Sequence, residues 1–461
     1  MTATNTIAPH AFAVWWKDFE RWDVKFFSAR VRSTYPVVRL DPLIREHSER
    51  VKPFDYPETT FRILGVTNTG GIFHAYDSLG KKIKQPYQKV DAGDFAYNPY
   101  RVNVGSIGVV PTDLGGNYIS PAYVVFATDK ARLLPEYLIL ILKADWFNPM
   151  VRAATAGSVR QNLTFDLLGT LEIPLPPLAE QKAIVTLWRK AQDEIVAARK
   201  RVVKLEAKLP LIVYQELGTP PPLAEKATEK CLVIWWKDLE RWSFNYLSRA
   251  SQGLAGFAKS KFPIEPLGKH LIETMNGYCI KPVAGPTPHK MLKLNALNPA
   301  GLDLTASKFI KISDRIAERF SLRKDDILIC RSNAYEYVAK CTLVRENQRA
   351  YLFPDIIIRA RVSPSVLPQF VTEVIQTPLG RSYFQINSRR AVGGMWKISA
   401  DDILNFPLPV PPLAVQKQIV ELVAAGREDI AREREAADRL AREINAEIEA
   451  LILCKKKVSE L

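Results

Sequence analysis

The sequence is poor in the residues that build disulfide frameworks and metal centres, and it has no long apolar run. Its 461 residues include five cysteines and five histidines, and no two cysteines form a CxxC pair. Nowhere do eighteen apolar residues follow one another, so no membrane-spanning helix is predicted. The first residues lack the basic start, apolar stretch and cleavage site of a signal peptide. We therefore expect a soluble protein in a reducing cytoplasm.

Catalytic motifs are missing from the sequence as well. It contains no GxxxxGK[ST] loop, no HExxH and no GxSxG. Asn98-Pro99-Tyr100 comes nearest to the Asn/Asp-Pro-Pro-aromatic motif of adenine methyltransferases, but it lacks the second proline and is interpreted as a turn. The histidines show neither metal-ligand nor triad spacing. We expect a chain that is not an enzyme and that holds no catalytic residue, metal or cofactor of its own.

Positive charge is abundant. Sixty-four lysines and arginines face 49 acidic residues, which gives a formal net charge of +15. Such a surplus attracts polyanions, with nucleic acid the first candidate and an acidic membrane surface the second. A generally basic protein without a nucleic-acid role is the alternative. With 47% hydrophobic residues the chain can bury real cores, and its length predicts two to four domains.

An internal repeat organises the chain. AVWWKDFERWDVKFFS at residues 13–28 returns as VIWWKDLERWSFNYLS at 233–248, and LEIPLPPLAEQKAIV at 171–185 returns as FPLPVPPLAVQKQIV at 406–420. Two unlike stretches of roughly 150 residues thus stand in one duplicated framework. The tryptophans could stack on bases, but their identical spacing in both copies favours framework packing; they are Trp15, Trp16, Trp22, Trp235, Trp236 and Trp242.

A long helix is predicted after each Pro-Pro-Leu, because proline is tolerated at the start of a helix. The first runs over residues 178–217, with Pro210 predicting a kink or an early stop, and the second from Leu413 to about Leu453, within the spacer segment 413–461. Each carries an apolar stripe at heptad spacing, although Glu433 and Glu447 interrupt the second stripe. The stripes would bury against each other or, alternatively, against the neighbouring domains. The packing residues that we predict are Trp188, Ile195, Val202, Leu205, Val423, Ile430, Ala437 and Ile444.

Both variable stretches are predicted to mix short strands with a helix near the end. Polar and basic residues on their loops are candidates for DNA contacts, because arginine pairs with guanine and Asn or Gln with adenine. In the first stretch the candidates are Arg101, Asn103, Arg160, Gln161 and Asn162. In the second they are Arg331, Ser332, Asn333, Arg389, Arg390 and Lys397. Taken singly, each could equally be an ordinary solvent-facing residue.

With two variable stretches, each followed by PLPPLAEQK-like sequence and a long helix, the chain resembles the specificity subunits of type I restriction–modification enzymes. FAYNPYRVNVGSIG and DILICRSN also resemble the target-recognition domains of that family. The resemblance implies an α+β fold: two mixed α/β target-recognition domains in tandem pseudo-repeat, separated by two long helices that form an antiparallel coiled coil. The expected domains are 1–177 and 232–412, joined by a proline-rich linker at 218–231.

The resemblance also implies the function and the partners. Each domain would read one half of a bipartite DNA site and direct adenine-N6 methylation. Two methyltransferase subunits would carry S-adenosylmethionine, and a motor-nuclease subunit using ATP and Mg²⁺ could join them to cleave DNA. Two alternatives stay open: a stand-alone DNA-modifying or DNA-cutting enzyme with an unrecognised active site, and a coiled-coil scaffold whose charge is incidental.

Overall fold

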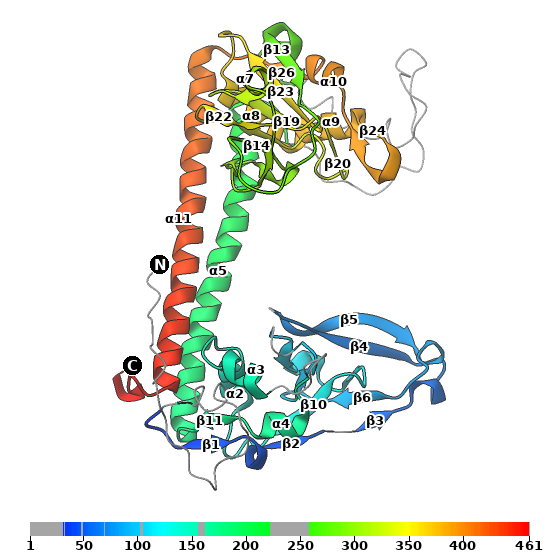
Figure 1. Ribbon diagram of the computed structural model, residues 1–461, viewed down its shortest axis with the longest axis vertical. Helices are drawn as coiled ribbons and strands as arrows, with labels where there is room; N and C mark the ends of the chain where they lie inside the picture. Colours follow the sequence, from blue (N-terminus) through cyan, green and yellow to red (C-terminus); the bar gives the residue numbers. More distant parts are fainter. Residues whose placement is uncertain are drawn as a thin grey trace. The chain divides into compact units, whose positions relative to one another are not determined.

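The computed structural model describes residues 31–460, apart from residues 32, 48, 69, 102–104, 155–161, 222–256 and 258 (Figure 1). The six tryptophans of the repeated elements lie outside the described residues. The chain divides into two compact units: unit 1 comprises residues 1–197 and 437–461, and unit 2 comprises residues 198–436. Both units contain helices and strands, which confirms the mixed α/β class. No described helix is long and apolar enough to cross a membrane.

Unit 1 is built on two main sheets. One has four strands in the order β2-β10-β7-β8, the other has five in the order β3-β6-β9-β4-β5, and β1 pairs with β11. The strands are β1 (Val37–Arg39), β2 (Ile44–Glu46), β3 (Arg50–Val51), β4 (Thr60–Thr67), β5 (Gly71–Leu79), β6 (Tyr87–Val90), β7 (Phe95–Tyr97), β8 (Ile107–Val109), β9 (Asn117–Ile119), β10 (Val124–Thr128) and β11 (Glu172–Pro174).

Three short helices complete the core of unit 1: α2 (Pro135–Leu142), α3 (Asn148–Ala154) and α4 (Phe165–Gly169). All three residues of β7 are buried, because β7 is an inner strand of its sheet. Phe95 of β7 stacks on Phe126 of β10, with ring centroids 4.7 Å apart. The strand-rich reading of DAGDFAYNPYRVNVGSIGVV therefore corresponds to β7 and β8, which flank the Asn98-Pro99 turn.

Unit 2 is built from more and shorter strands. They are β12 (Ile264–Pro266), β13 (Leu271–Asn276), β14 (His289–Leu292), β15 (Leu297–Asn298), β16 (Gly301–Leu302), β17 (Ser307–Ile310), β18 (Ser321–Leu322), β19 (Ile327–Cys330), β20 (Ser332–Asn333), β21 (Cys341–Leu343), β22 (Gln348–Leu352), β23 (Ile357–Val362), β24 (Arg389–Arg390), β25 (Trp396–Lys397) and β26 (Pro407–Pro409). Its short helices are α7 (Asp314–Phe320), α8 (Pro368–Gln376), α9 (Pro378–Asn387) and α10 (Ala400–Leu404).

The central sheet of unit 2 has the order β13-β23-β19-β21, and β12 pairs with β26. These pairings follow the same chain order as β2-β10-β7-β8 and the β1–β11 pair in unit 1. The turn before the central strand also repeats. Asp94 accepts a hydrogen bond from the amide of Asp91 at 2.8 Å, and Asp326 accepts one from the amide of Arg323 at 2.8 Å. The residue before each of these aspartates has a left-handed backbone, namely Gly93 with φ 90° and Asp325 with φ 69°.

Two helices of 40 residues each follow the proline-rich elements: α5 (Leu178–Leu217) and α11 (Leu413–Ile452). The early stop considered at Pro210 is wrong, because α5 continues to Leu217. The second helix ends at Ile452, close to the predicted end near Leu453. Cys454 adopts a left-handed φ of 53°, and the amide of Lys455 donates back to Ala450 at 2.7 Å. This arrangement ends the helix in the manner of a Schellman turn.

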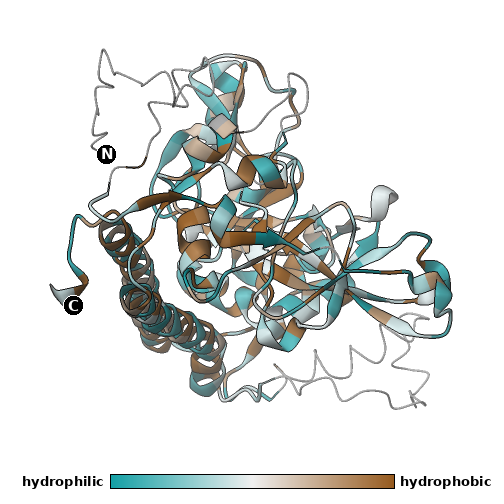
Figure 2. Cartoon of the chain, turned by 90° about the horizontal axis from the view of Figure 1, so that it is seen from below, coloured by the Kyte–Doolittle hydropathy of each residue, from teal (hydrophilic) through white to brown (hydrophobic). Residues whose placement is uncertain are grey.

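The predicted packing residues of both helices are turned inward. Ile195, Val202, Val423, Ile430, Ala437 and Ile444 are buried, and Trp188 and Leu205 are half-buried. Within unit 1, Ile195 of α5 and Ile444 of α11 belong to one hydrophobic core. Figure 2 shows hydrophobic and hydrophilic residues mixed along the long helices, as expected when one stripe packs and the rest is solvated.

Within unit 2, polar pairs show that the two helical segments run antiparallel. Arg201 of α5 pairs with Glu433 of α11 at 3.1 Å, and Gln418 of α11 donates to Glu216 of α5 at 3.3 Å. Glu433 is one of the acids that interrupt the apolar stripe, so the Arg201 guanidinium compensates this interruption.

Candidate nucleic-acid interface

The candidate residues of the second variable stretch come together in one small sheet. Three two-residue strands pair in the order β20-β25-β24, so segments 331–333, 389–390 and 396–397 become neighbours. Lys397 lies opposite Ser332 on one side and opposite Arg389 on the other. These residues were expected on loops. All but Arg331, which directly precedes β20, occupy short strands instead, because backbone pairing links segments more than fifty residues apart in the sequence.

Exposure separates the members of this sheet. Arg389, Arg390 and Lys397 are exposed, and Arg331 and Asn333 are half-buried. Ser332 is only 1% exposed, and its hydroxyl lies 4.0 Å from the sulfur of Met395. Ser332 is therefore placed as a packing residue, and its side chain is not available to a ligand on the surface.

The exposed cations lie on paired strands, and no acidic partner is found for them in the part of the chain that the structure describes. Arg389 is directly opposite Lys397, an arrangement that destabilises a strand pair by charge repulsion. No carboxylate of the described residues lies within 4.0 Å of Arg389, Arg390 or Lys397. A bound polyanion would relieve the repulsion, and Met395, 42% exposed at the end of the same hairpin, adds an apolar contact.

The sheet is held by its turn and by an aromatic pair. Gly393 and Gly394 both have φ 78°, a left-handed conformation that few other residues adopt easily, and Ala391 donates to Met395 across the turn at 2.7 Å. Tyr335 packs edge-on against Trp396, with ring centroids 5.0 Å apart. The β24–β25 hairpin is therefore held in a defined conformation by its turn and by its packing.

A buried charge network lies directly before β20. Arg359, 1% exposed, donates to Glu273 at 2.5 Å, and Arg361 donates to Asp326 at 2.6 Å and to Glu273 at 2.5 Å. Burial alone would raise the pKa of Glu273, but the hydrogen bonds and charges of the two arginines outweigh it and lower this pKa. The network ties β13 and β23 to the turn at Asp326, and so positions β19 and the strand β20 that follows it.

In unit 1 the structure describes Arg101 and Asn162, whereas Asn103, Arg160 and Gln161 lie outside the described residues. Arg101 is exposed and its amide donates to Asn98 at 3.0 Å. Asn162 is half-buried, and its neighbour Leu163 donates to Pro99 at 3.0 Å. In unit 2 the amide of Ile398 donates to Arg331 at 3.0 Å in the corresponding place. The two segments that carry the unit 1 candidates are therefore neighbours as well.

Sequence reasoning missed the role of one glutamine in each Pro-Pro-Leu element. Gln416 is fully buried, accepts from the amide of Leu367 at 2.8 Å and donates to the carbonyl of Pro411 at 2.9 Å. Gln181 does the same in unit 1, with Leu134 and Pro176 both at 2.9 Å. Leu367 is the N-cap of α8, and Leu134 is the N-cap of α2. A leucine side chain cannot accept a hydrogen bond and so cannot cap a helix. The repetition of the glutamine is visible in the sequence motif, but the backbone groups that it binds cannot be identified from the sequence.

The fold and the cationic sheet define a multidomain protein with surfaces suited to nucleic acid. Residues 88–205 match the family model described as the type I restriction modification DNA specificity domain. Over this segment the chain is therefore similar to type I restriction–modification specificity subunits.

Two relatives and one solved structure give the extent of the similarity. The chain is 26% identical over 302 residues to the type I restriction enzyme EcoKI specificity subunit of Escherichia coli (strain K12), covering 63% of this chain and 59% of the relative. It is 24% identical over 294 residues to the StySPI specificity subunit of Salmonella potsdam, covering 63% of this chain and 58% of the relative. The matches thus span less than two thirds of either relative.

The fold is also shared with a chain solved in work described as "Structural basis underlying complex assembly and conformational transition of the type I R-M system". That similarity covers 91% of this chain and 98% of the other, with a TM-score of 0.58 and 17% sequence identity.

Proposed function

We propose that this chain is the DNA sequence-specificity subunit of a type I restriction–modification complex and that it recognises a bipartite DNA site. The observation that carries the proposal is the cluster of cations on the β20-β25-β24 sheet, which have no carboxylate partner among the described residues. The major groove of B-DNA admits a two-stranded β-ribbon, and arginine reads guanine there through two hydrogen bonds. Arg389, Arg390 and Lys397 are the proposed contacts of the second half-site, with Arg331 and Asn333 at the edge of the same surface.

Unit 1 would read the other half-site. Arg101 and Asn162 are its proposed contacts, together with Asn103, Arg160 and Gln161. The matched strand orders of the two units support a tandem pseudo-repeat, in which each copy presents the same two segments to DNA. Phosphate contacts from the basic surface would add affinity that falls as salt rises.

The two long helices are proposed to be the spacer between the half-sites. Forty helical residues span about 60 Å at about 1.5 Å per residue. The antiparallel pairs within unit 2 and the shared core within unit 1 support an antiparallel coiled coil formed by α5 and α11. Since the same face of DNA recurs about every 34 Å, a rigid spacer would fix the gap between two half-sites.

The chemistry would belong to partner subunits. The proposed assembly contains two methyltransferase subunits that carry S-adenosylmethionine and methylate adenine at N6. A motor-nuclease subunit that uses ATP and Mg²⁺ would add cleavage. Adenine must leave the base stack to be methylated, which a reader that grips the DNA on both sides would support. The chain itself would be non-catalytic and would act in the cytoplasm, where the chromosome lies.

Methylation mapping in the host tests this proposal. The host gene is deleted and replaced by the wild type, by Arg389→Ala/Arg390→Ala, or by Lys417→Ala/Arg432→Ala, which removes equal charge from the exposed surface of α11. The wild type and the control pair are expected to restore a methylated motif split by a gap. The sheet variant should lose this methylation or relax one half of the motif, because each bidentate contact discriminates by about 1–3 kcal/mol.

Other outcomes would refute the proposal. An uninterrupted motif would contradict the bipartite site, and a sheet variant equal to the control pair would contradict the placement of the contacts. Methyl transfer or cleavage by the purified chain alone would establish an enzyme instead.

A further inference from the structure

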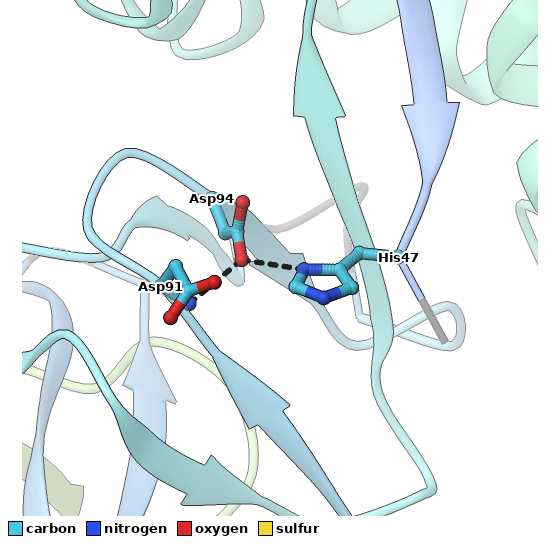
Figure 3. A group of neighbouring side chains, drawn as sticks. All are labelled: His47, Asp91 and Asp94. Atoms are coloured by element: carbon cyan, nitrogen blue, oxygen red, sulfur yellow. Dashed lines mark hydrogen bonds and ion pairs between the residues drawn. The ribbon is translucent and has the colours of Figure 1, made fainter. Parts of the chain in front are cut away.

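A histidine and two aspartates meet at the edge of the central sheet of unit 1 (Figure 3). His47 follows β2, and Asp91 and Asp94 belong to the turn between β6 and β7. One ligand atom from each residue lies within 4.8 Å of the others. The Nδ1 atom of His47 is 2.8 Å from the Oδ2 atom of Asp94. The main chain of His47 is held next to β10, because the amide of His47 donates to Val125 at 2.9 Å.

The equivalent place in unit 2 shows what the buried aspartate requires. Asp326 is 1% exposed, and its carboxylate is neutralised by Arg361, with Arg359 4.0 Å away. Glu273 shares both arginines. Two carboxylates are therefore balanced there by two guanidinium groups, as buried charges require.

Unit 1 has the same turn without the arginines. Phe126 pairs with Phe95 next to Asp94, as Ala360 pairs with Ile327 next to Asp326. Val125 and Ala127 thus stand where unit 2 has Arg359 and Arg361. Asp91 in turn stands where unit 2 has Arg323, so the unit 1 turn gains a carboxylate as it loses a cation.

At this turn unit 1 has two carboxylates but lacks the two arginines of unit 2, so the negative charges are not balanced in the same way. Asp94 is 5% exposed, and among the ion pairs of the described residues its one partner is the neighbouring imidazole of His47. Asp91 is exposed and can turn its carboxylate toward the same point. One imidazole and two carboxylates form a ligand set that suits Zn²⁺ and similar first-row divalent ions.

We propose that His47, Asp91 and Asp94 form a binding site for a divalent transition-metal ion, which replaces the guanidinium groups of unit 2. The ion binds His47 through Nδ1 and each aspartate through one carboxylate oxygen. Zinc–ligand distances are about 2.0–2.2 Å, so the 2.8 Å pair of His47 and Asp94 needs only a small separation to admit the ion. The exposed side leaves a coordination position for water. The ion ties the end of β2 to the β6–β7 turn, so its role is to stabilise unit 1.

Zinc binding to the full chain tests the site. The protein is stripped of metal with a chelator and titrated with Zn²⁺ by calorimetry, and its melting temperature is followed with and without Zn²⁺. The wild type is expected to bind one more equivalent than His47→Gln or Asp91→Asn, or to bind that equivalent at least tenfold more tightly. The zinc-dependent rise in melting temperature should shrink in both variants. Neither variant removes Asp94, which also holds the turn.

His74→Gln is the matched control. His74 is 2.9 Å from Asp77 in the same unit, an exposed histidine–aspartate pair outside the cluster. This variant should bind zinc like the wild type. If the wild type, His47→Gln and Asp91→Asn have the same stoichiometry and affinity, or if His74→Gln loses as much binding as they do, the site does not exist and His47–Asp94 is an ordinary hydrogen-bonded pair.

Discussion

Replacing Gln416 with leucine is expected to loosen the start of α8. The wild-type amide serves two buried backbone groups at once: it accepts from Leu367 at 2.8 Å and donates to Pro411 at 2.9 Å. Leucine is similar in size to glutamine but can do neither. The substitution therefore leaves a backbone N–H and a carbonyl without these partners in a place from which water is excluded.

The cost can be worked from these two contacts. A buried polar group left without its partner costs about 1–3 kcal/mol, so the two together cost about 2–6 kcal/mol. That is a large share of the stability of an ordinary domain, about 5–15 kcal/mol. The loss should be concentrated at the contact between α8 and the first turn of α11, because both hydrogen bonds lie there.

Hydrogen exchange measured by mass spectrometry is the suitable assay, since it reports local opening. Peptides that cover residues 367–376 should lose protection by at least tenfold, which corresponds to about 1.4 kcal/mol. Gln418→Leu is the control, because Gln418 lies two residues away on the exposed side of α11 and makes one surface hydrogen bond. Equal protection in the two variants would refute the assignment of Gln416 as the residue that holds α8.

Two further predictions concern charge and length. Because the pKa of Glu273 is lowered below its usual 4.5, its contribution to stability is present above pH 4.5 and is lost as the pH falls through the lower pKa of the folded state. The urea midpoint of the wild type should therefore drop below about pH 4.5, and it should drop less in Glu273→Gln. Parallel curves of urea midpoint against pH for the two proteins would contradict this. Inserting one heptad at matched positions of α5 and α11 lengthens each by about 10 Å. Methylation mapping should then show a gap wider by roughly three base pairs at about 3.4 Å each, with both half-sites unchanged, and altered half-sites would exclude a simple spacer.

The sequence by itself determined the features that depend on near neighbours in the chain. The helix starts at Leu178 and Leu413 follow from local proline rules, and the inward residues of α5 and α11 follow from heptad spacing. The central strands were visible because apolar runs with turn signals on either side are local too. The end of α11 at Ile452 lies close to the predicted position, but the left-handed backbone of Cys454 that follows it is not predicted by any residue preference.

Tertiary structure decided what joins distant segments. Nothing in the sequence indicates that Asn333 pairs with Trp396, and this pairing is what brings Arg331 and Asn333 to the hairpin that carries Arg389, Arg390 and Lys397. The hydrogen bond that Gln416 accepts from the helix cap Leu367, 49 residues away, is likewise a long-range contact, as is the pair of His47 and Asp94, which are 47 residues apart. Chain neighbours set the helices and strands, whereas the sites depend on side chains that meet only after the sheets have formed.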